Sequence, residues 1–180
     1  MKIAFVSVED PNDPHSWSGI PFHMLGAIRR KCPVEVIAPL HRSFRYMYVG
    51  HKILGNISHR RFQIDRQPLA LRSYRKQIAN RLKTCGADVV FAPSSVPVSL
   101  LDTRLPILFW TDAVWEPMLE YYDGFSRLSR TSLINGHKQD KWHSIEHHSL
   151  STRRTGQPRA YCAIIRWIPP KLGSSHLDQT

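Results

Sequence analysis

Short apolar runs that alternate with helical stretches are the feature that most constrains the fold of this chain. The runs that we predict as strands lie at residues 2–8, 34–38, 87–92 and 106–110. Each is rich in β-branched and aromatic residues and ends at Pro, Gly or polar residues, which is typical of strands. Strands that are apolar throughout and separated by helices indicate a parallel sheet covered on both faces. We therefore expect an α/β fold, a Rossmann-like open parallel sheet flanked by helices.

The first predicted helix follows the first strand after a polar loop. Ile20, Met24 and Ile28 recur at the i, i+4 and i+8 positions of one helical face. Ser18 precedes this face and can cap the helix, and Pro21 suits its first turn. The next strand then completes a strand-helix-strand unit, whose crossover is almost always right-handed.

A second predicted helix covers residues 68–83 and stops at Gly86. Its apolar face consists of Leu71, Tyr74, Ile78 and Leu82. Residues 41–67, which precede it, are rich in Arg and Tyr and have weak periodicity, so they are predicted only as helix or loop. Short helices are expected after the third strand, through Leu100 and Leu101, and after the fourth, over residues 114–122.

The carboxyl edge of this predicted sheet collects the candidate site residues. In open parallel α/β sheets, ligands bind outside the carboxyl ends of the strands. Gly19, Ser94, Ser95, Thr111 and Asp112 all follow predicted strands and are expected at that edge. The sequence therefore predicts a binding site there.

Ser18 and Gly19 are candidates for binding a phosphate of donor or acceptor. Free backbone N–H groups at a helix start attract anions, and Gly lets a ligand approach the backbone closely. A plain helix cap is an equal alternative, because the sequence has no G-x-G-x-x-G fingerprint. Ser94 and Ser95 can bind an acceptor through their hydroxyls, although a helix cap is the favoured interpretation.

Asp112 is the candidate catalytic residue, with Thr111 as its neighbour. A carboxylate at the end of a strand can orient an acceptor hydroxyl or act as a general base. A cap for the following helix is the alternative, because Asp is a good N-cap. Trp110 and Trp115 flank this position, and core packing is favoured over stacking on a sugar for both.

Positive charge is concentrated in one part of the chain. The formal net charge is +11, and between residues 28 and 85 the only acids among many Lys and Arg are Glu35 and Asp65. Arg binds phosphate through its planar fork, so a phosphate-bearing partner is predicted: an anionic membrane surface, a phosphorylated acceptor or nucleic acid. Nucleic acid is disfavoured, because no helix-turn-helix, zinc-finger or RNA-binding strand motif occurs. Alternatively, these basic residues lie on helix faces that are exposed to water and bind no partner.

The cysteines and apolar runs indicate location. Three cysteines without a C-x-x-C pair, and no apolar run long enough for a membrane span or signal peptide, favour a cytoplasmic protein with reduced thiols. The inner face of the membrane is the alternative location. His143, His147 and His148 lack an H-E-x-x-H motif, so no metal site and no cofactor are expected.

Several stretches together resemble the N-terminal domain of a family-4-like glycosyltransferase of the two-Rossmann-domain (GT-B) class. They are KIAFVSVED, SWSGIPFHM, ADVVFAPSSVPVSLL, PILFWTDAVWEPMLEYY and FSRLSRTSLINGHKQDK. The resemblance covers residues 1–138 and implies an acceptor-side domain of an enzyme that moves a sugar from a nucleotide-sugar to a hydroxyl, usually with retention. Its donor nucleotide binds mainly a second domain, so this chain alone is expected to be inactive.

Residues 139–180 depart from the resemblance. If the last base of each codon is read with the first two of the next, the genetic code permits a peptide similar to the family's next strand and helix. At some positions the shifted codon can encode only one residue, and these residues agree with that peptide: Trp142–His143 gives Ala, Tyr161–Cys162 gives Leu and Trp167–Ile168 gives Asp. We expect a frameshift near residues 139–142, an incomplete half-domain at 1–138 and an aberrant or poorly ordered, irregular tail at 139–180. A natural short protein with its own tail is the alternative.

Two other functions remain open from the residues alone. The basic segment makes a binding module for an anionic membrane or nucleic acid the main alternative. A different nucleotide-binding Rossmann protein is less favoured. The second predicted strand ends in Ile37, Ala38 and Pro39 and lacks the acidic residue of a dinucleotide fingerprint.

Overall fold

The computed structural model describes residues 1–42, 49–50, 59–111, 115–119, 121–145 and 164–166. The strands are β1 (Ile3–Val6), β2 (Val34–Ile37), β3 (Val89–Ala92), β4 (Ile107–Thr111) and β5 (Ile164–Arg166). The helices are α1 (Ile20–Arg29), α3 (Pro68–Cys85), α4 (Trp115–Met118) and α5 (Arg130–Ile145). Short 3-10 turns lie at η1 (Ser16–Gly19), η2 (Ile64–Arg66) and η3 (Asp123–Phe125).

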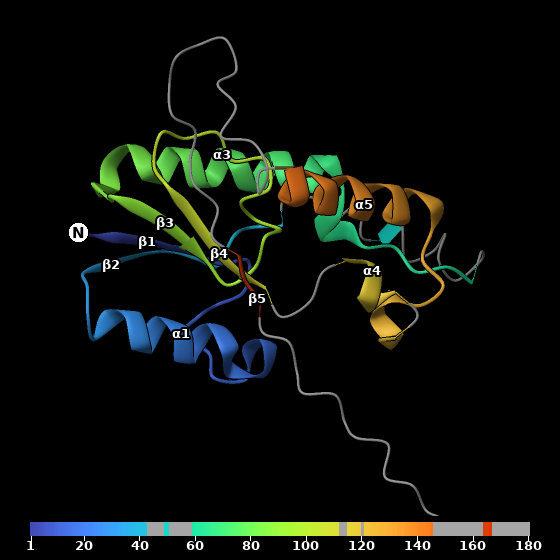
Figure 1. Cartoon of the computed structure of the whole chain (residues 1–180), viewed down its shortest axis with the longest axis horizontal. Coiled ribbons are helices and arrows are strands. Elements are labelled where there is room, and N and C mark those ends of the chain that lie inside the picture. The colour runs from blue at the N-terminus through green and yellow to red at the C-terminus, as the bar shows by residue number, and fades with distance from the viewer. Residues whose placement is uncertain (43–48, 51–58, 112–114, 120, 146–163, 167–180) are drawn as a thin grey trace, which may run out of the picture.

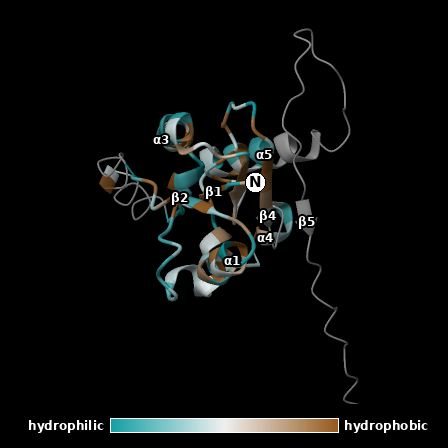
Figure 2. Cartoon of the chain, turned by 90° about the vertical axis from the view of Figure 1, so that its left-hand side faces the viewer, coloured by the Kyte–Doolittle hydropathy of each residue, from teal (hydrophilic) through white to brown (hydrophobic). Residues whose placement is uncertain are grey.

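The strands form one open sheet in the order β2-β1-β3-β4, with β5 beside β4, and every pairing is parallel. Figure 1 shows α1 on one face of this sheet and α3 with α5 on the other. In the view of Figure 2, α1 and α3 again lie on opposite sides of the strands. The expected α/β fold, a Rossmann-like parallel sheet flanked by helices, is confirmed.

The side chains of β1 show why its sequence is apolar throughout. Ala4 and Val6 are fully buried in the cluster that α3 covers. Phe5 points to the opposite face, because side chains alternate along a strand. It is fully buried as well, with its ring 5.5 Å from that of Phe91 in β3. A strand between two helical layers therefore buries both of its faces.

The predicted apolar face of α3 is confirmed. Tyr74 and Ile78 have no exposed surface, Leu71 is buried, and Leu82 packs against the same cluster. Gly86 ends the helix with φ +60°, a left-handed conformation that Gly adopts readily. Burial of this face ties the otherwise basic helix to the sheet.

The helix expected between β3 and β4 does not form. Residues 93–100 are bends and turns, in which Ser99 N donates to Val96 O and Leu101 N to Val98 O. Pro97 would lie in the first turn of the predicted helix, where proline is tolerated, so its missing N–H does not account for the difference. Burial of Pro93 and Pro97 instead fixes a compact turn against the core.

The predicted helix over residues 114–122 is shorter in the structure, because α4 contains only Trp115–Met118. After it, α5 runs from Arg130 to Ile145 and so crosses the expected boundary at residue 139. Within the expected tail, β5 pairs with β4. The rest of the tail, residues 146–163 and 167–180, lies outside the described residues. Of the helices described, none is long and apolar enough to cross a bilayer.

Candidate functional site

The carboxyl ends of β1 to β4 lie at the same edge of the sheet, because all four strands are parallel. The start of α1 lies at this edge too (Figure 1). Ser94 and Ser95 follow β3 there and are both half-buried. Thr111 is the last residue of β4. The structure therefore brings Gly19, the two serines and Thr111 to one edge.

Gly19 has a conformational reason to be glycine. It is the N-cap of α1 with φ +76°, and a Cβ there would lie 3.0 Å from the carbonyl oxygen of Pro14. Both a left-handed backbone and a close main-chain approach therefore favour glycine at this position.

Ser18 is not the cap of α1. The N-cap is Gly19, and no side chain hydrogen-bonds to the first turn. Ser18 is exposed and, like Trp17, has a positive φ, 54° for Ser18 and 44° for Trp17. The left-handed turn separates Ser18 from the first turn of the helix, so the prediction of a serine cap is wrong.

Asp112, the candidate catalytic residue, lies outside the described residues. Its neighbour Thr111 ends β4, where its backbone is in register with Arg166 of β5. The catalytic role of Asp112 therefore remains a prediction.

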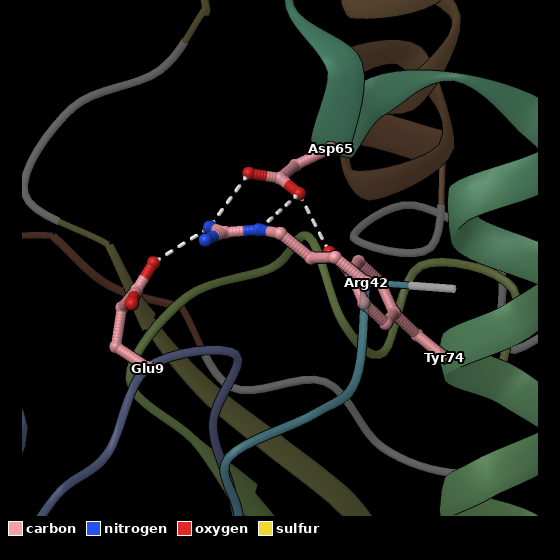
Figure 3. A network of polar contacts seen from close by, with 4 residues as sticks. All are labelled: Glu9, Arg42, Asp65 and Tyr74. Atoms are coloured by element: carbon pink, nitrogen blue, oxygen red, sulfur yellow. Dashed lines mark hydrogen bonds and ion pairs between the residues drawn. The ribbon is translucent and has the colours of Figure 1, made fainter. Parts of the chain in front are cut away.

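Four residues that the sequence did not single out as a site form a polar network at this edge (Figure 3). Arg42 lies at its centre: its Nε and Nη2 donate to the two carboxylate oxygens of Asp65, both at 3.0 Å. The same Nη2 lies 2.7 Å from Oε1 of Glu9, which follows β1. The Tyr74 hydroxyl donates to Asp65 Oδ1 at 2.6 Å.

The electrostatics of this network favour a charged Arg and a neutral Tyr. Burial on its own lowers the pKa of Arg42, but the hydrogen bonds and negative charges of Asp65 and Glu9 outweigh it and hold the pKa above its usual value. Burial raises the pKa of Tyr74, and the hydrogen bond and charge of Asp65 raise it further. With one cation between two carboxylates, the net charge of the network is negative. Arg42 therefore joins the loop after β1 to η2.

A sign of the network was present in the sequence. Asp65 is one of only two acids in the basic segment, and Tyr74 is a hydroxyl-bearing residue on a predicted buried face. Buried hydroxyls need partners, so a Tyr on the core face points to an acceptor nearby. The spacing between Asp65 and Tyr74 alone does not identify the pair, because they belong to different elements.

Other arginines of the basic segment also have partners within the chain. Arg66 Nη1 donates to Gln139 Oε1 at 2.9 Å, and its guanidinium lies 4.5 Å from the ring centre of Trp115. Arg60 donates to the Leu128 carbonyl at 3.2 Å, and Arg61 donates to the Asp123 carbonyl. These contacts join the segment before α3 to η3 and α5, so much of the basic charge has a structural role.

Trp115 is a core residue, as favoured from the sequence. It is 1% exposed and packs edge-on against Phe125, with ring centres 5.7 Å apart. Its indole therefore offers no face for a sugar. Trp110 is half-buried on β4.

Metal-ligating side chains do not cluster in the described part of the chain, where no three His, Cys, Asp or Glu lie close enough to hold an ion. Cys32 and Cys85 are free thiols, each half-buried.

Comparison with protein-family models, with curated proteins and with solved structures finds no match to this chain.

Proposed function

We propose that this chain is the acceptor-side Rossmann-like domain of a GT-B glycosyltransferase that moves a sugar from a nucleotide-sugar to a hydroxyl. The observation that supports the proposal is the parallel sheet in the order β2-β1-β3-β4, with Gly19, Ser94, Ser95 and Thr111 at its carboxyl edge. Such an edge is where parallel α/β sheets bind ligands. The enzyme class itself comes from the sequence resemblance.

Each edge residue has a role in this proposal. The Ser18–Gly19 turn faces a phosphate of donor or acceptor, and Ser94 and Ser95 hydrogen-bond the acceptor. Asp112, beside Thr111, takes the proton of the attacking hydroxyl. A general base of this kind contributes about 10²–10⁴-fold in rate. The turn at residues 93–100 supports the serines' role, because they do not cap a helix there.

The chain by itself does not transfer sugar in this proposal. The resemblance assigns the donor nucleotide mainly to a second domain, and holding two reactants in register is worth roughly 7–11 kcal/mol of the barrier. We further propose that the codons after Gln139 are out of frame. The donor-binding half would then be encoded in the shifted frame.

The experiment compares two proteins, the chain as given and the frame-restored gene product, in nucleotide-release assays with UDP-, GDP- and ADP-sugars. The chain as given is expected to show no turnover, whereas the product of the gene with its frame restored near codons 139–142 transfers sugar. In that product, Asp112→Asn lowers kcat by about 10²-fold or more. Asp102→Asn, an exposed aspartate 3.7 Å from Arg75, is the control and leaves kcat unchanged. A stop codon early in the shifted frame, or turnover by the chain alone, would overturn the proposal.

An anionic membrane surface is the second candidate partner, supported by the +11 net charge. Binding of this kind is electrostatic and weakens as salt is added. Sedimentation with vesicles of phosphatidylglycerol and phosphatidylcholine, at low and high salt, measures it. The chain is expected to bind only the vesicles that contain phosphatidylglycerol, and binding to pure phosphatidylcholine would contradict this.

A further inference from the structure

A cavity of about 430 Å³ lies between the loop that follows β1 and one side of α1. This volume is within the range of small-molecule sites. The cavity extends along α1 from Phe22 to Arg30, so it lies along the helix and away from the predicted site residues that follow β3 and β4.

The inner wall of this cavity is apolar. Pro11 and Leu25 line it and are themselves buried, with Leu25 only 1% exposed. Phe22 forms an outer wall and is 40% exposed, with its ring edge-on to His23 at 5.4 Å. An exposed aromatic ring beside an apolar wall suits a flat or aliphatic group.

Positive charge is found at one end of the cavity. Arg29, the last residue of α1, and Arg30, which follows as its C-cap, line it there, and both are exposed. Arg29 Nη1 donates to the neutral Asn12 side chain at 3.4 Å. Neither arginine forms an ion pair with a carboxylate among the residues placed by the structure.

The acids of the adjacent loop form no ion pair with these arginines in the described part of the chain. Asp10 Oδ1 accepts hydrogen bonds from the backbone and side chain of Asn12, at 2.9 and 3.1 Å. Asp13 Oδ1 accepts from the backbone of His15 at 2.9 Å. Each carboxylate is thus bonded within its own loop.

Gly26 keeps the cavity open. It lies in the interior of α1, where Gly is less stable than Ala by about 1 kcal/mol in helix propensity. Its φ is not positive, and a Cβ there would approach only Arg30 Nη1, at 4.0 Å. Neither backbone conformation nor packing therefore requires glycine at this position, and a larger side chain would project into open space.

We propose that this cavity binds a phosphomonoester that carries an apolar group, with the apolar group against Pro11, Phe22 and Leu25 and the phosphate on Arg29 and Arg30. Guanidinium groups bind phosphate through paired, charge-assisted hydrogen bonds. Charge and apolar surface lie at different places in one cavity, so a ligand with both features fits better than an inorganic ion or a neutral lipid. None of the residues that line this cavity has a role in the proposed transfer reaction.

Isothermal titration calorimetry of the full chain tests the proposal with monomeric dihexanoyl phosphatidic acid. The controls are dihexanoyl phosphatidylcholine, which has the same chains, and inorganic phosphate. Phosphatidic acid is expected to bind at least about tenfold tighter than either control, because only it satisfies both the arginines and the apolar wall.

Two variants separate the parts of the site. Arg29→Gln with Arg30→Gln removes the phosphate contacts, and Gly26→Leu fills the cavity without strain in the helix. Each is expected to weaken binding at least about tenfold, while thermal melts show that the variants remain folded. Arg72→Gln, an exposed arginine on α3 across the sheet, is the matched control and leaves binding unchanged.

Several results would overturn the proposal. If inorganic phosphate bound as tightly as phosphatidic acid, the apolar wall would not contribute to binding. If phosphatidylcholine bound as tightly as phosphatidic acid, the arginines would not contribute. Unchanged binding in folded Gly26→Leu would place the ligand elsewhere. An equal loss in Arg72→Gln would show a general charge effect, and no binding of phosphatidic acid would exclude the site.

Discussion

Gly136 of α5 and Gly26 of α1 are both glycines inside helices, but their surroundings predict opposite responses to alanine. A Cβ built on Gly136 would overlap the indole of Trp115. That ring cannot easily move aside, because it is 1% exposed, packs against Phe125 and has the Arg66 guanidinium over its face. At Gly26, a Cβ approaches only Arg30.

The two changes have the same effect on helix propensity. Alanine in place of glycine in a helix interior stabilises by about 1 kcal/mol. Overpacking a buried site typically costs about 1–3 kcal/mol. Three indole atoms would be overlapped at Gly136, so the upper figure of about 3 kcal/mol applies there. The net expectation is a loss of about 2 kcal/mol for Gly136→Ala and a gain of about 1 kcal/mol for Gly26→Ala.

Urea unfolding followed by far-UV circular dichroism measures both variants, and thermal melts give a second reading. At about 2–4 °C per kcal/mol for a chain of this size, Tm is expected to fall by roughly 4–8 °C for Gly136→Ala and to rise by roughly 2–4 °C for Gly26→Ala. Gly136→Ala that is as stable as the unmodified chain would refute the packing of α5 on Trp115. If both variants were stabilised equally, helix propensity alone would determine the effect of alanine at the two positions.

Three further changes concern the polar network and the turn before α1. Tyr74→Phe is expected to cost about 1.5 kcal/mol, because it removes a hydrogen bond to a charged group. Because the pKa of Tyr74 is raised in the folded chain, the stabilisation by its hydroxyl is complete below about pH 10, where the tyrosine of the unfolded chain is also protonated, and is lost as pH rises further. The difference in unfolding free energy between Tyr74→Phe and the unmodified chain should therefore be smaller above pH 10 than at pH 8. A difference that stays constant with pH would contradict this. Arg42→Gln is expected to cost about 1 kcal/mol at low salt and less in 1 M NaCl, because the Arg42 side chain is 46% exposed and salt screens its ion pairs. A cost in urea unfolding that is independent of salt would count against the network. Ser18→Gly is expected to raise stability by about 0.5 kcal/mol, because glycine adopts a φ of 54° without strain; a thermal melt that shows a loss would contradict the left-handed turn.

The strands, their parallel arrangement and the core face of α3 were predictable from the sequence. Continuous apolar runs such as residues 2–8 occur where both faces of a strand are buried, and helical spacing places Leu71, Tyr74 and Ile78 on one face. Gly86 was predictable as a helix end because few other residues adopt its left-handed conformation. These features depend on local pattern alone.

The misplaced elements depend on contacts between distant residues. A turn forms at residues 93–100, where Pro93 and Pro97 are buried against the core. The left-handed turn at Trp17 and Ser18 follows from no local preference, since such residues rarely adopt positive φ. The bonds from Arg42 to Glu9 and Asp65 span 33 and 23 positions, so spacing along the chain does not reveal them.

The bonds around Arg42 also fix where this fold tolerates a change of length. Arg42 and Asp65 meet directly, and the backbone of His41 exchanges hydrogen bonds with the Gln77 side chain at 2.8 and 2.9 Å. The two residues that flank positions 43–64 are therefore held together. Arg60, Arg61 and Gln63 of that segment are themselves bonded to residues 123–132, so an insertion beside them would disturb the packing of η3 and α5. Extra sequence between positions 42 and 59 would leave all of these bonds in place, and each doubling of the length of such a closed connection costs only about 0.6 kcal/mol.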